Sequence, residues 1–290
     1  MFYPAPMSTP RVALITGGAG FIGRRVARAL ALQGWRLVVV DALTYAAHPK
    51  ALAEAVAEAE AQGPRESASH STPQSAPHST PQSAPSITLE HGDVADGVWL
   101  DAVFARWSPT VVLHLAAETH VDRALLDAAP FLRTNVLGTQ AVVRSCVRHG
   151  VERLVHVSTD EVYGDREGRA ATVEGDSVAP TNAYAASKAC GDHLVLAAVR
   201  AEGLNAVVTR GVNTYGPGQF PEKLLPLAAR RWAQGEPMAL YGDGLQRRQW
   251  LAVDDHAAGV VAALHAGERG AVLHFAGESL TNREVLRRWA

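Results

Sequence analysis

A glycine-rich loop near the N-terminus constrains the fold of this chain more than any other feature of its sequence. The loop, TGGAGFIG at positions 16–23, follows a run of apolar residues and precedes a helical pattern. Gly18, Gly20 and Gly23 fit the spacing G-x-G-x-x-G, and Gly17 begins the related spacing G-x-x-G-x-x-G. Such glycines let the backbone approach a pyrophosphate, which the free N–H groups at the start of the helix bind. The context of strand, loop and helix favours dinucleotide binding over an ordinary glycine turn.

An acidic residue after the next apolar run indicates which dinucleotide the loop accepts. Residues 36–41 are expected to form a second strand, and Asp41 ends it at the distance from the glycines that is typical of a ribose-binding acid. A carboxylate there accepts hydrogen bonds from the adenosine ribose and repels a 2′-phosphate. The sequence therefore predicts NAD, rather than NADP, as the cofactor.

Apolar runs alternate with helical patterns over the first two thirds of the chain. Strands are expected over 11–16, 36–41, 87–90, 111–115, 154–158 and 206–209, and helices over 21–33 and 50–62. Because these runs are continuous rather than alternating, they are typical of strands buried on both faces of a parallel sheet. The predicted fold class is α/β, a Rossmann-type doubly wound parallel sheet with a smaller, shortened C-terminal substrate lobe.

The expected domain organisation has four parts. Residues 1–10 are expected to be a flexible N-terminus, and 11–214 an NAD-binding Rossmann domain. Within it, HSTPQSAP at 70–77 is repeated at 78–85; since these residues cannot bury enough apolar surface, 63–86 are predicted to be a disordered insertion. Residues 215–290 are the predicted substrate lobe, with helices over 222–234 and 254–265 and strands over 238–241, 249–253 and 272–275.

Composition excludes several classes of protein. Lys and Arg number 27 against 29 Asp and Glu, a net charge of −2, which disfavours nucleic-acid binding. No apolar run approaches the roughly 18 residues that span a bilayer, and the first ten residues do not resemble a signal peptide. Two cysteines are too few for a disulfide framework or a Cys-rich metal site, and no metal is predicted. We therefore expect a cytoplasmic protein without nucleic-acid or membrane partners.

Tyr184 and Lys188 are the first candidate catalytic residues. They stand four residues apart in a helical pattern, so they share a face of the helix. A lysine ammonium near a phenol is expected to pull the tyrosine pKa down toward neutrality, which suits a base that takes a proton from a hydroxyl. A Tyr-x-x-x-Lys pair by itself is more often a coincidence of surface residues, but the glycine loop upstream reverses this preference.

A second candidate group, Thr159, Asp160 and Glu161, directly follows the expected strand 154–158. Open α/β sheets bind ligands at the carboxyl ends of their strands. The two carboxylates are therefore either solvated loop acids that cap a helix, or an acid and a base that act on neighbouring carbons of a substrate. In the second case their proximity helps to keep one of them protonated.

The chain resembles the extended short-chain dehydrogenases/reductases, and within them the dTDP-glucose 4,6-dehydratases. The segment STDEVYGD (158–165) discriminates this group from epimerases and decarboxylases of the same fold, which usually lack the adjacent acids. The other segments that carry the resemblance are TGGAGFIG (16–23), VDALTYA (40–46), HGDVAD (91–96), HLAAETHVDRAL (114–125), TNVLGT (134–139), YAASK (184–188), NTYGPGQFPEKLLPL (213–227) and RRQWLAVDDHA (247–257).

The resemblance implies a lyase that converts a nucleotide-activated hexose, dTDP-glucose above all, to a 4-keto-6-deoxy sugar with tightly bound NAD. Tyr184, assisted by Lys188 and Thr159, would deprotonate the 4-hydroxyl as hydride leaves C4. Glu161 would then remove the C5 proton, Asp160 would protonate the departing 6-hydroxyl, and hydride would return to C6. Two alternatives remain open at this point: another sugar-nucleotide epimerase or decarboxylase, and a catalytically inactive NAD-binding protein.

The resemblance also implies ligand contacts and an assembly. Homologous positions would place a homodimer interface on the helices that carry TNV and YxxxK. The expected cofactor residues are Gly17, Gly20, Phe21, Ile22, Gly23, Asp41, Thr44, Asp93, Val94, Ala117 and Thr134. The expected substrate residues are Thr119, His120, Asn213, Lys223, Leu224 and Arg248.

Three departures from the family pattern are visible in the sequence. Thr214 occupies the place of the second of two asparagines, and the segment 274–278 reads HFAGE instead of a YNIGG-like sequence. The family continues beyond the position of Ala290 through an RPGHDxRY-like segment. The substrate lobe is therefore expected to be C-terminally short.

Overall fold

The computed structural model describes residues 11–62, 87–165, 171–238, 240 and 242–289. The expectations of a flexible N-terminus over 1–10 and of a disordered insertion over 63–86 lie outside the described residues.

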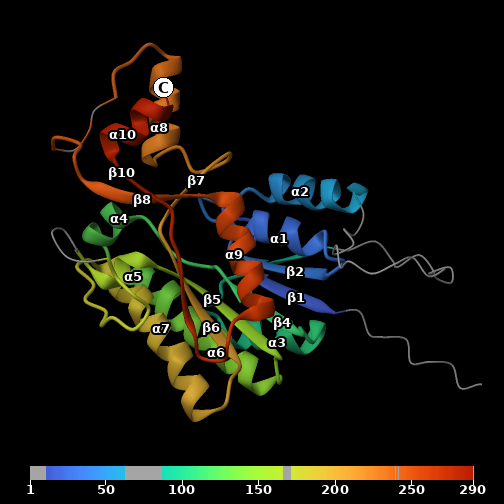
Figure 1. The fold of residues 1–290 in the computed structure, drawn as a ribbon. Helices are drawn as coiled ribbons and strands as arrows, with labels where there is room; N and C mark the ends of the chain where they lie inside the picture. The colour runs from blue at the N-terminus through green and yellow to red at the C-terminus, as the bar shows by residue number, and fades with distance from the viewer. Residues whose placement is uncertain (1–10, 63–86, 166–170, 239, 241, 290) are drawn as a thin grey trace, which may run out of the picture.

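In the part of the chain that the structure describes, seven parallel strands form the central sheet (Figure 1). Its order is β3 (Ile87–His91), β2 (Arg36–Asp41), β1 (Val12–Thr16), β4 (Val111–His114), β5 (Arg153–Thr159), β6 (Ala206–Gly211) and β9 (Val272–Phe275). The chain first adds strands outward from β1 and then starts again on the other side of β1 with β4. This reversal is the topological switch of a doubly wound sheet. The predicted Rossmann-type α/β fold is confirmed.

Helices cover both faces of this sheet. On one face lie α1 (Gly23–Ala31), α2 (Pro49–Gln62) and α9 (Val253–Ala266), and on the other α3 (Gly97–Trp107), α6 (Thr139–Arg148) and α7 (Ala183–Ala201). Successive residues of β1 alternate between the two layers: Ala13 and Ile15 pack in one core, and Val12 and Leu14 in the other. Because both faces are covered, the strands read as unbroken apolar runs.

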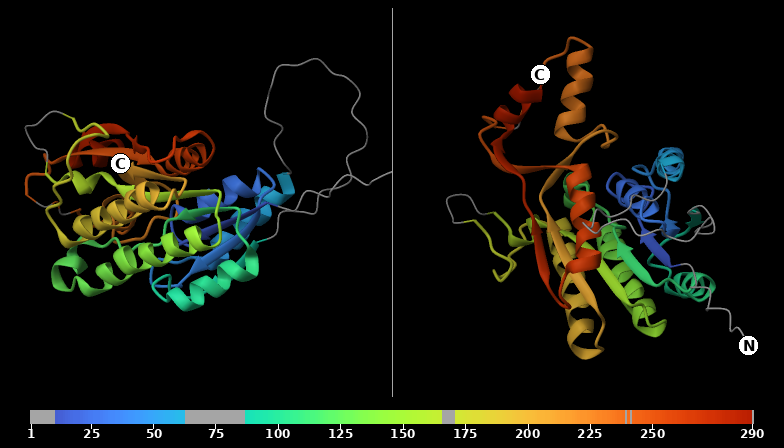
Figure 2. Two further views of the ribbon diagram at one scale, coloured as in Figure 1. Left: turned by 90° about the horizontal axis from the view of Figure 1, so that it is seen from below. Right: turned by 45° about the vertical axis from the view of Figure 1, so that its right-hand side comes forward.

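A smaller layer lies beyond the carboxyl ends of the central strands, as the views of Figures 1 and 2 show. Three further described strands form its sheet, in the order β10 (Glu278–Thr281), β8 (Arg247–Ala252) and β7 (Asn213–Tyr215). Helices α8 (Leu224–Ala233) and α10 (Asn282–Trp289) complete this layer. Leu225, Ala228, Leu280, Val285 and Leu286 form its core.

The chain does not pass from the large layer to the small one only once. After β8, helix α9 returns to pack beside α1, and β9 pairs with β6 in the central sheet. The domain boundary expected at residue 214 stays a prediction. The residues after it do not all belong to the smaller layer, because β9 is a strand of the central sheet.

The strand expected over 238–241 is wrong where it is described. Met238 and Leu240 are not in a strand, whereas 239 and 241 lie outside the described residues. Pro237 and the left-handed Gly242 (φ 59°) flank the segment, and Met238 and Leu240 pack against the small core instead. Their apolar character therefore reflects burial rather than strand pairing.

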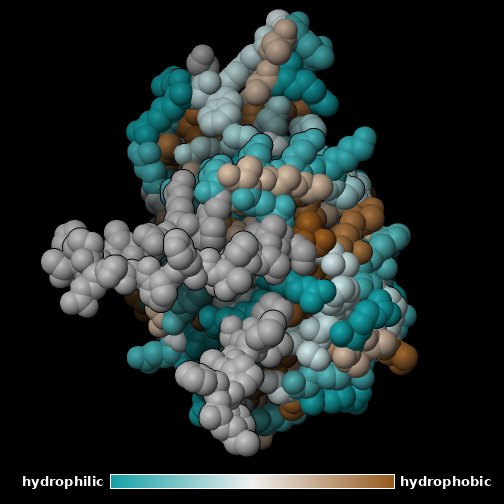
Figure 3. Space-filling model, turned by 90° about the vertical axis from the view of Figure 1, so that its right-hand side faces the viewer, coloured by the Kyte–Doolittle hydropathy of each residue, from teal (hydrophilic) through white to brown (hydrophobic). Residues whose placement is uncertain are grey.

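The face shown in Figure 3 is largely hydrophilic, with apolar side chains gathered in small areas. Among the residues that the structure describes, none of the helices combines the length and the apolar character that a membrane span requires.

Candidate active site

A cavity of about 550 Å³ opens between the central sheet and the smaller layer. The residues that follow β1, β4, β5 and β6 contribute to its wall, with residues from the loop after β7. This is the crevice at the topological switch in which open α/β sheets bind their ligands. The topology of the sheet therefore brings together segments that are far apart in the sequence.

The glycine loop forms one end of the cavity with a geometry that requires glycine. Gly17 has φ 68°, and a Cβ there would lie 2.7 Å from the backbone nitrogen of Ala116. A Cβ on Gly23 would overlap the carbonyl oxygen of Gly17. The tight loop places Phe21, Ile22 and Gly23, at the start of α1, on the cavity wall. The positive end of the helix dipole therefore faces the cavity.

Asp41 lies at the end of β2 and lines the same cavity. Its carboxylate accepts hydrogen bonds from the backbone N–H groups of Ala19 (2.9 Å) and Leu43 (2.8 Å). These two bonds hold the carboxylate against the glycine loop and leave further lone pairs on both oxygens. The glycine cradle, the open helix start and this acid together fit a dinucleotide with free ribose hydroxyls.

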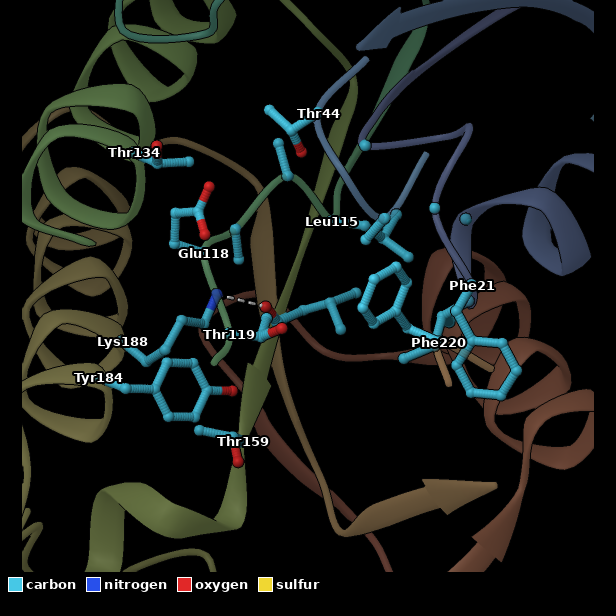
Figure 4. A pocket seen from close by; sticks show the side chains of 18 of the residues that line it. Phe21, Thr44, Leu115, Glu118, Thr119, Thr134, Thr159, Tyr184, Lys188 and Phe220 are labelled. Atoms are coloured by element: carbon cyan, nitrogen blue, oxygen red, sulfur yellow. Dashed lines mark hydrogen bonds between the residues drawn. The ribbon is translucent and has the colours of Figure 1, made fainter. Parts of the chain in front are cut away.

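Helix α7 supplies Tyr184 and Lys188, both of which line the cavity and are almost fully buried. Asn182 caps the helix by accepting the N–H of Ala185 at 2.8 Å, so the chain turns into α7 immediately before the tyrosine. The Lys188 ammonium donates to the carbonyl of Val157 on β5 at 2.8 Å. The Tyr184 side chain lies beside Thr159 on the cavity wall (Figure 4).

The prediction that Lys188 lowers the pKa of Tyr184 is wrong in the environment that the protein groups alone create. Burial, followed by the negative charges of Glu161 and Asp160, raises the pKa of Tyr184, and the Thr159 hydrogen bond only partly opposes this. Burial also lowers the pKa of Lys188 to about 8. Burial disfavours the charged forms of both Tyr184 and Lys188, whereas the prediction from the sequence considered only the attraction between the two charges.

Asp160 and Glu161 lie in the 3₁₀ turn η2 (Asp160–Tyr163), which directly follows β5. Thr159 caps this turn by accepting the N–H of Glu161 at 3.2 Å, and Asn182 donates to the Glu161 carboxylate at 3.3 Å. Both carboxylates line the cavity. Burial, reinforced by the charge of Glu161, raises the pKa of Asp160 to about 6. The two acids therefore differ in their surroundings, as an acid and base pair requires.

The cavity gathers most of the site residues expected from the sequence, and their roles stay predictions. Its wall includes Gly17, Gly20, Phe21, Ile22, Gly23, Asp41, Thr44, Asp93, Val94, Ala117, Thr119, Thr134, Thr159, Asp160, Glu161, Tyr184, Lys188, Asn213 and Lys223.

Three expected substrate residues are not part of the wall. His120 pairs with Glu222, a wall residue, at 3.0 Å. Leu224 begins α8 and packs on the core of the smaller layer, as an apolar residue at a helix start does. Arg248 lies on β8 and donates to its neighbour's carbonyl, although its charge still lowers the pKa of Asp160.

The cavity wall also includes residues that were not predicted from the sequence. Tyr45 and Phe220 meet edge to face, with ring centroids 5.2 Å apart, across segments that are 175 positions apart in the sequence. Glu118 also lines the wall, and its backbone N–H donates to the buried Asn135 at 2.9 Å. Asn135 belongs to the π-helical turn η1 (Leu132–Gly138). The three wall residues, Tyr45, Glu118 and Phe220, and the buried Asn135 all lie within segments that carry the resemblance.

The departure at Thr214 has a local explanation. Its hydroxyl lies 2.7 Å from Nδ1 of His256 on α9, and both residues line the cavity. Among the described residues there is no group of three or more His, Cys, Asp or Glu side chains arranged to hold a metal ion.

Comparison with known proteins places this site in a family context. Residues 13–276 match the family model described as NAD dependent epimerase/dehydratase family. A dTDP-glucose 4,6-dehydratase of Streptomyces griseus is 42% identical over 278 residues, which cover 94% of this chain and 76% of that protein. The corresponding protein of Neisseria meningitidis serogroup B is 38% identical, covering 96% and 74%.

Solved structures give the same result. A dTDP-glucose 4,6-dehydratase of Streptomyces venezuelae, crystallised with NAD bound, superimposes with a TM-score of 0.82 at 36% identity. The match covers 96% of this chain and 80% of that one.

Proposed function

The chain belongs to the NAD dependent epimerase/dehydratase family, and on that premise we propose that it is a hydro-lyase that dehydrates dTDP-glucose to the 4-keto-6-deoxy sugar. The observation that carries the proposal is the position of two adjacent acids, Asp160 and Glu161, in one cavity with Tyr184 and Lys188. Relatives of up to 42% identity that share most of this chain carry the name of that activity. When bound, NAD supplies the oxidant for C4 and the reductant for C6 within one turnover.

The first step requires a proton acceptor for the sugar 4-hydroxyl. The Tyr184 phenol is buried in the cavity, and Thr159 hydrogen-bonds to it. Lys188 brings a positive charge to the same wall, held by the carbonyl of Val157. Burial raises the pKa of Tyr184, so this step needs the positive charge of Lys188 and that of bound NAD⁺, which would both favour the phenolate. The phenolate takes the proton of the 4-hydroxyl while C4 is oxidised to the ketone.

The second step is the loss of water across C5 and C6. The 4-ketone acidifies the C5 proton, which the Glu161 carboxylate removes. Asp160 donates a proton to the departing 6-hydroxyl, and its pKa of about 6 leaves part of it protonated near neutral pH. The water that leaves therefore consists of the 6-hydroxide and the Asp160 proton. Glu161 holds the proton from C5, exchanges it with solvent and returns a proton to C5 as C6 is reduced.

The substrate lobe holds the nucleotide diphosphate. Lys223 and Asn213 on the cavity wall suit an anion, and Thr119, on the same wall, would contact the sugar. Arg248 and His120, which are not part of the cavity wall, are proposed to help hold the substrate from beside it. The reaction takes place in the cytoplasm, in keeping with the free thiols of Cys146 and Cys190.

A homodimer is part of the same proposal. Leu132 and Leu137 on η1 are each about half exposed, at 51% and 53%, on the TNV segment expected to form the interface. Burying such side chains between two copies stabilises a dimer by removing apolar surface from water. Sedimentation or light scattering measures the assembly.

The decisive experiment follows dTDP-glucose and the NAD-loaded protein in D₂O by mass spectrometry. We expect loss of one water and incorporation of deuterium at C5. Glu161→Gln, which keeps the hydrogen-bonding shape of the side chain, is expected to lower the rate of both by about 10²-fold because it removes the C5 base. A 4-epimer without loss of water, or unaltered exchange in Glu161→Gln, would contradict the proposal.

Asp160→Asn is expected to separate stability from activity. The pKa of Asp160 in the folded protein, about 6, is above its ordinary value of 3.8. The folded state therefore binds the extra proton between these pH values, and this contribution to stability is lost as pH rises through 6. Relative to the wild type, Asp160→Asn gains up to about 3 kcal/mol between pH 4 and pH 8 while dehydration slows.

Urea unfolding at pH 4 and pH 8 measures this difference in stability. Asp243→Asn is the matched control, because Asp243 is an exposed loop acid outside the cavity wall. If the difference in the free energy of unfolding between Asp160→Asn and the wild type does not change with pH, Asp160 is not a buried carboxyl with a raised pKa.

A further inference from the structure

A buried ion pair lies beside the proposed active site, and neither of its members has a role in the steps of the proposed dehydration. Asp192 follows Lys188 by one turn of α7, and Arg210 lies on β6. The Arg210 Nε donates to Asp192 Oδ2 at 2.9 Å, and the two side chains are 1% and 4% exposed. Because burying both charges costs desolvation energy, an apolar pair of similar volume often stabilises a fold equally well. Stability alone is therefore a weak explanation for this pair.

Arg210 makes a second contact that connects two parts of the site. Its Nη1 donates to the hydroxyl of Tyr163 at 2.5 Å. Tyr163 ends η2, the turn that begins with Asp160 and Glu161, and its hydroxyl also lies 2.6 Å from Nε2 of His274. One guanidinium thus holds α7 through Asp192 and η2 through Tyr163.

We propose that Asp192 and Arg210 are positioning residues for the reaction, because the pair joins the helix that carries Tyr184 and Lys188 to the turn that carries Asp160 and Glu161. This inference rests on the proposed dehydration. That reaction uses the tyrosine at C4 and the two acids at C5 and C6, so the helix and the turn must keep a fixed separation. A displacement of about 1 Å of one group costs about 10²-fold in rate.

The charge of Asp192 gives the pair a second effect on the same wall. Burial lowers the pKa of Lys188, and Asp192 is the acid that opposes this. His114 on β4 and His156 on β5 also interact with the lysine charge, and Arg210 on β6 acts on His156. Tyr184, Asp160 and Glu161 share the cavity wall with the lysine. Burial lowers the pKa of both histidines, so they are neutral near pH 7, and Arg210 carries a like charge.

The test uses three variants of the full-length protein. Asp192→Asn removes the negative charge. Asp192→Asn combined with Arg210→Met removes both charges, so that no buried ion is left without a partner. Tyr163→Phe keeps the ring and the ion pair but removes the hydroxyl that joins Arg210 to η2.

Asp101→Asn is the matched control. Asp101 also pairs with an arginine, Arg148, at 2.8 Å and with a histidine, His149, at 3.0 Å, but it lies on α3 outside the cavity wall. Its loss removes the same kinds of contact without touching the site.

We expect kcat for dTDP-glucose to fall by about 10-fold to 100-fold in each of the three variants, with KM within about 3-fold of the wild-type value. In Asp192→Asn the alkaline limb of the kcat profile also moves down by about one pH unit, because Lys188 loses its proton more readily. In the double variant the like charge of Arg210 is removed as well, so this limb moves less. Tyr163→Phe keeps the wild-type alkaline limb, and Asp101→Asn keeps both the wild-type kcat and the wild-type alkaline limb. A folded double variant with the wild-type kcat would overturn the inference, as would a wild-type kcat in Tyr163→Phe or a wild-type alkaline limb in Asp192→Asn.

A second readout does not depend on the substrate. The pKa of Lys188 in the folded protein, about 8, is below its ordinary value of 10.5. Between these two pH values the unfolded protein binds more protons than the folded one, so the free energy of unfolding increases as the pH rises. In Asp192→Asn this rise begins at a lower pH, and in Lys188→Met it is absent. Thermal unfolding from pH 6 to pH 10 measures it. If the wild type does not dehydrate dTDP-glucose, the proposed function fails, and an unshifted rise in Asp192→Asn would separately exclude the effect of Asp192.

Discussion

Tyr184→Phe is expected to lower kcat for dehydration by about 10³-fold while the protein keeps its fold and its NAD. The phenol oxygen is the only atom removed, and it is the proposed acceptor of the 4-hydroxyl proton. The ring itself remains packed edge to face against Phe131, with centroids 6.4 Å apart. Losing the hydrogen bond with Thr159 changes the stability by only about 1 kcal/mol.

The measurement combines turnover of dTDP-glucose with the NAD content of the purified protein. Tyr215→Phe is the matched control, since Tyr215 also packs its ring edge to face, on Trp289, but lies in the smaller layer outside the cavity wall. It should keep the wild-type rate. If Tyr184→Phe kept kcat within about 3-fold of the wild type, Tyr184 would not be the proton acceptor.

Gly23→Ala is expected to destabilise the protein by more than about 3 kcal/mol and to abolish copurification of NAD. The added Cβ would overlap the carbonyl oxygen of Gly17 and approach Cα of Gly18 to 2.7 Å. These are backbone atoms of a tight loop, so the clash is relieved only by moving the loop away from the helix start. The pyrophosphate site depends on that close approach.

Gly175→Ala is the matched control for the same exchange. Apart from its chain neighbours, no residue in the described part of the chain lies within 4 Å of a Cβ placed on Gly175, so we expect a neutral effect on stability. Urea unfolding and the absorbance of released cofactor measure both variants. A Gly23→Ala protein with wild-type stability and NAD content would show that the loop does not need the glycine.

Local sequence patterns were sufficient to predict the cofactor half of the molecule. The glycines of the loop, the apolar run that ends at Asp41 and the Tyr184–Lys188 spacing are short-range features, and the structure places all of them on one cavity. Such features report backbone geometry and helix faces directly, because these repeat every few residues. The resemblance extended the prediction to residues such as Thr134 and Asn213.

Predictions failed where long-range packing decides the outcome. The fall expected for the pKa of Tyr184 did not occur, because burial depends on what surrounds the side chain and not on a neighbour four residues away. Leu224 resembles a substrate residue by position, yet it packs on the small core. The helix and strand that return to the central sheet after β8 gave no local signal of their destination.

For this protein the amino-acid sequence by itself determined the class of fold, and it predicted most of the residues that the structure brings together on one cavity wall. Only the tertiary structure decided how those side chains are charged and held. Asp192, Arg210 and Tyr163 are separated by up to 47 positions in the chain, and they meet because α7, β6 and η2 pack together. Desolvation and ion pairing act through space, so a pattern along the chain carries no measure of either.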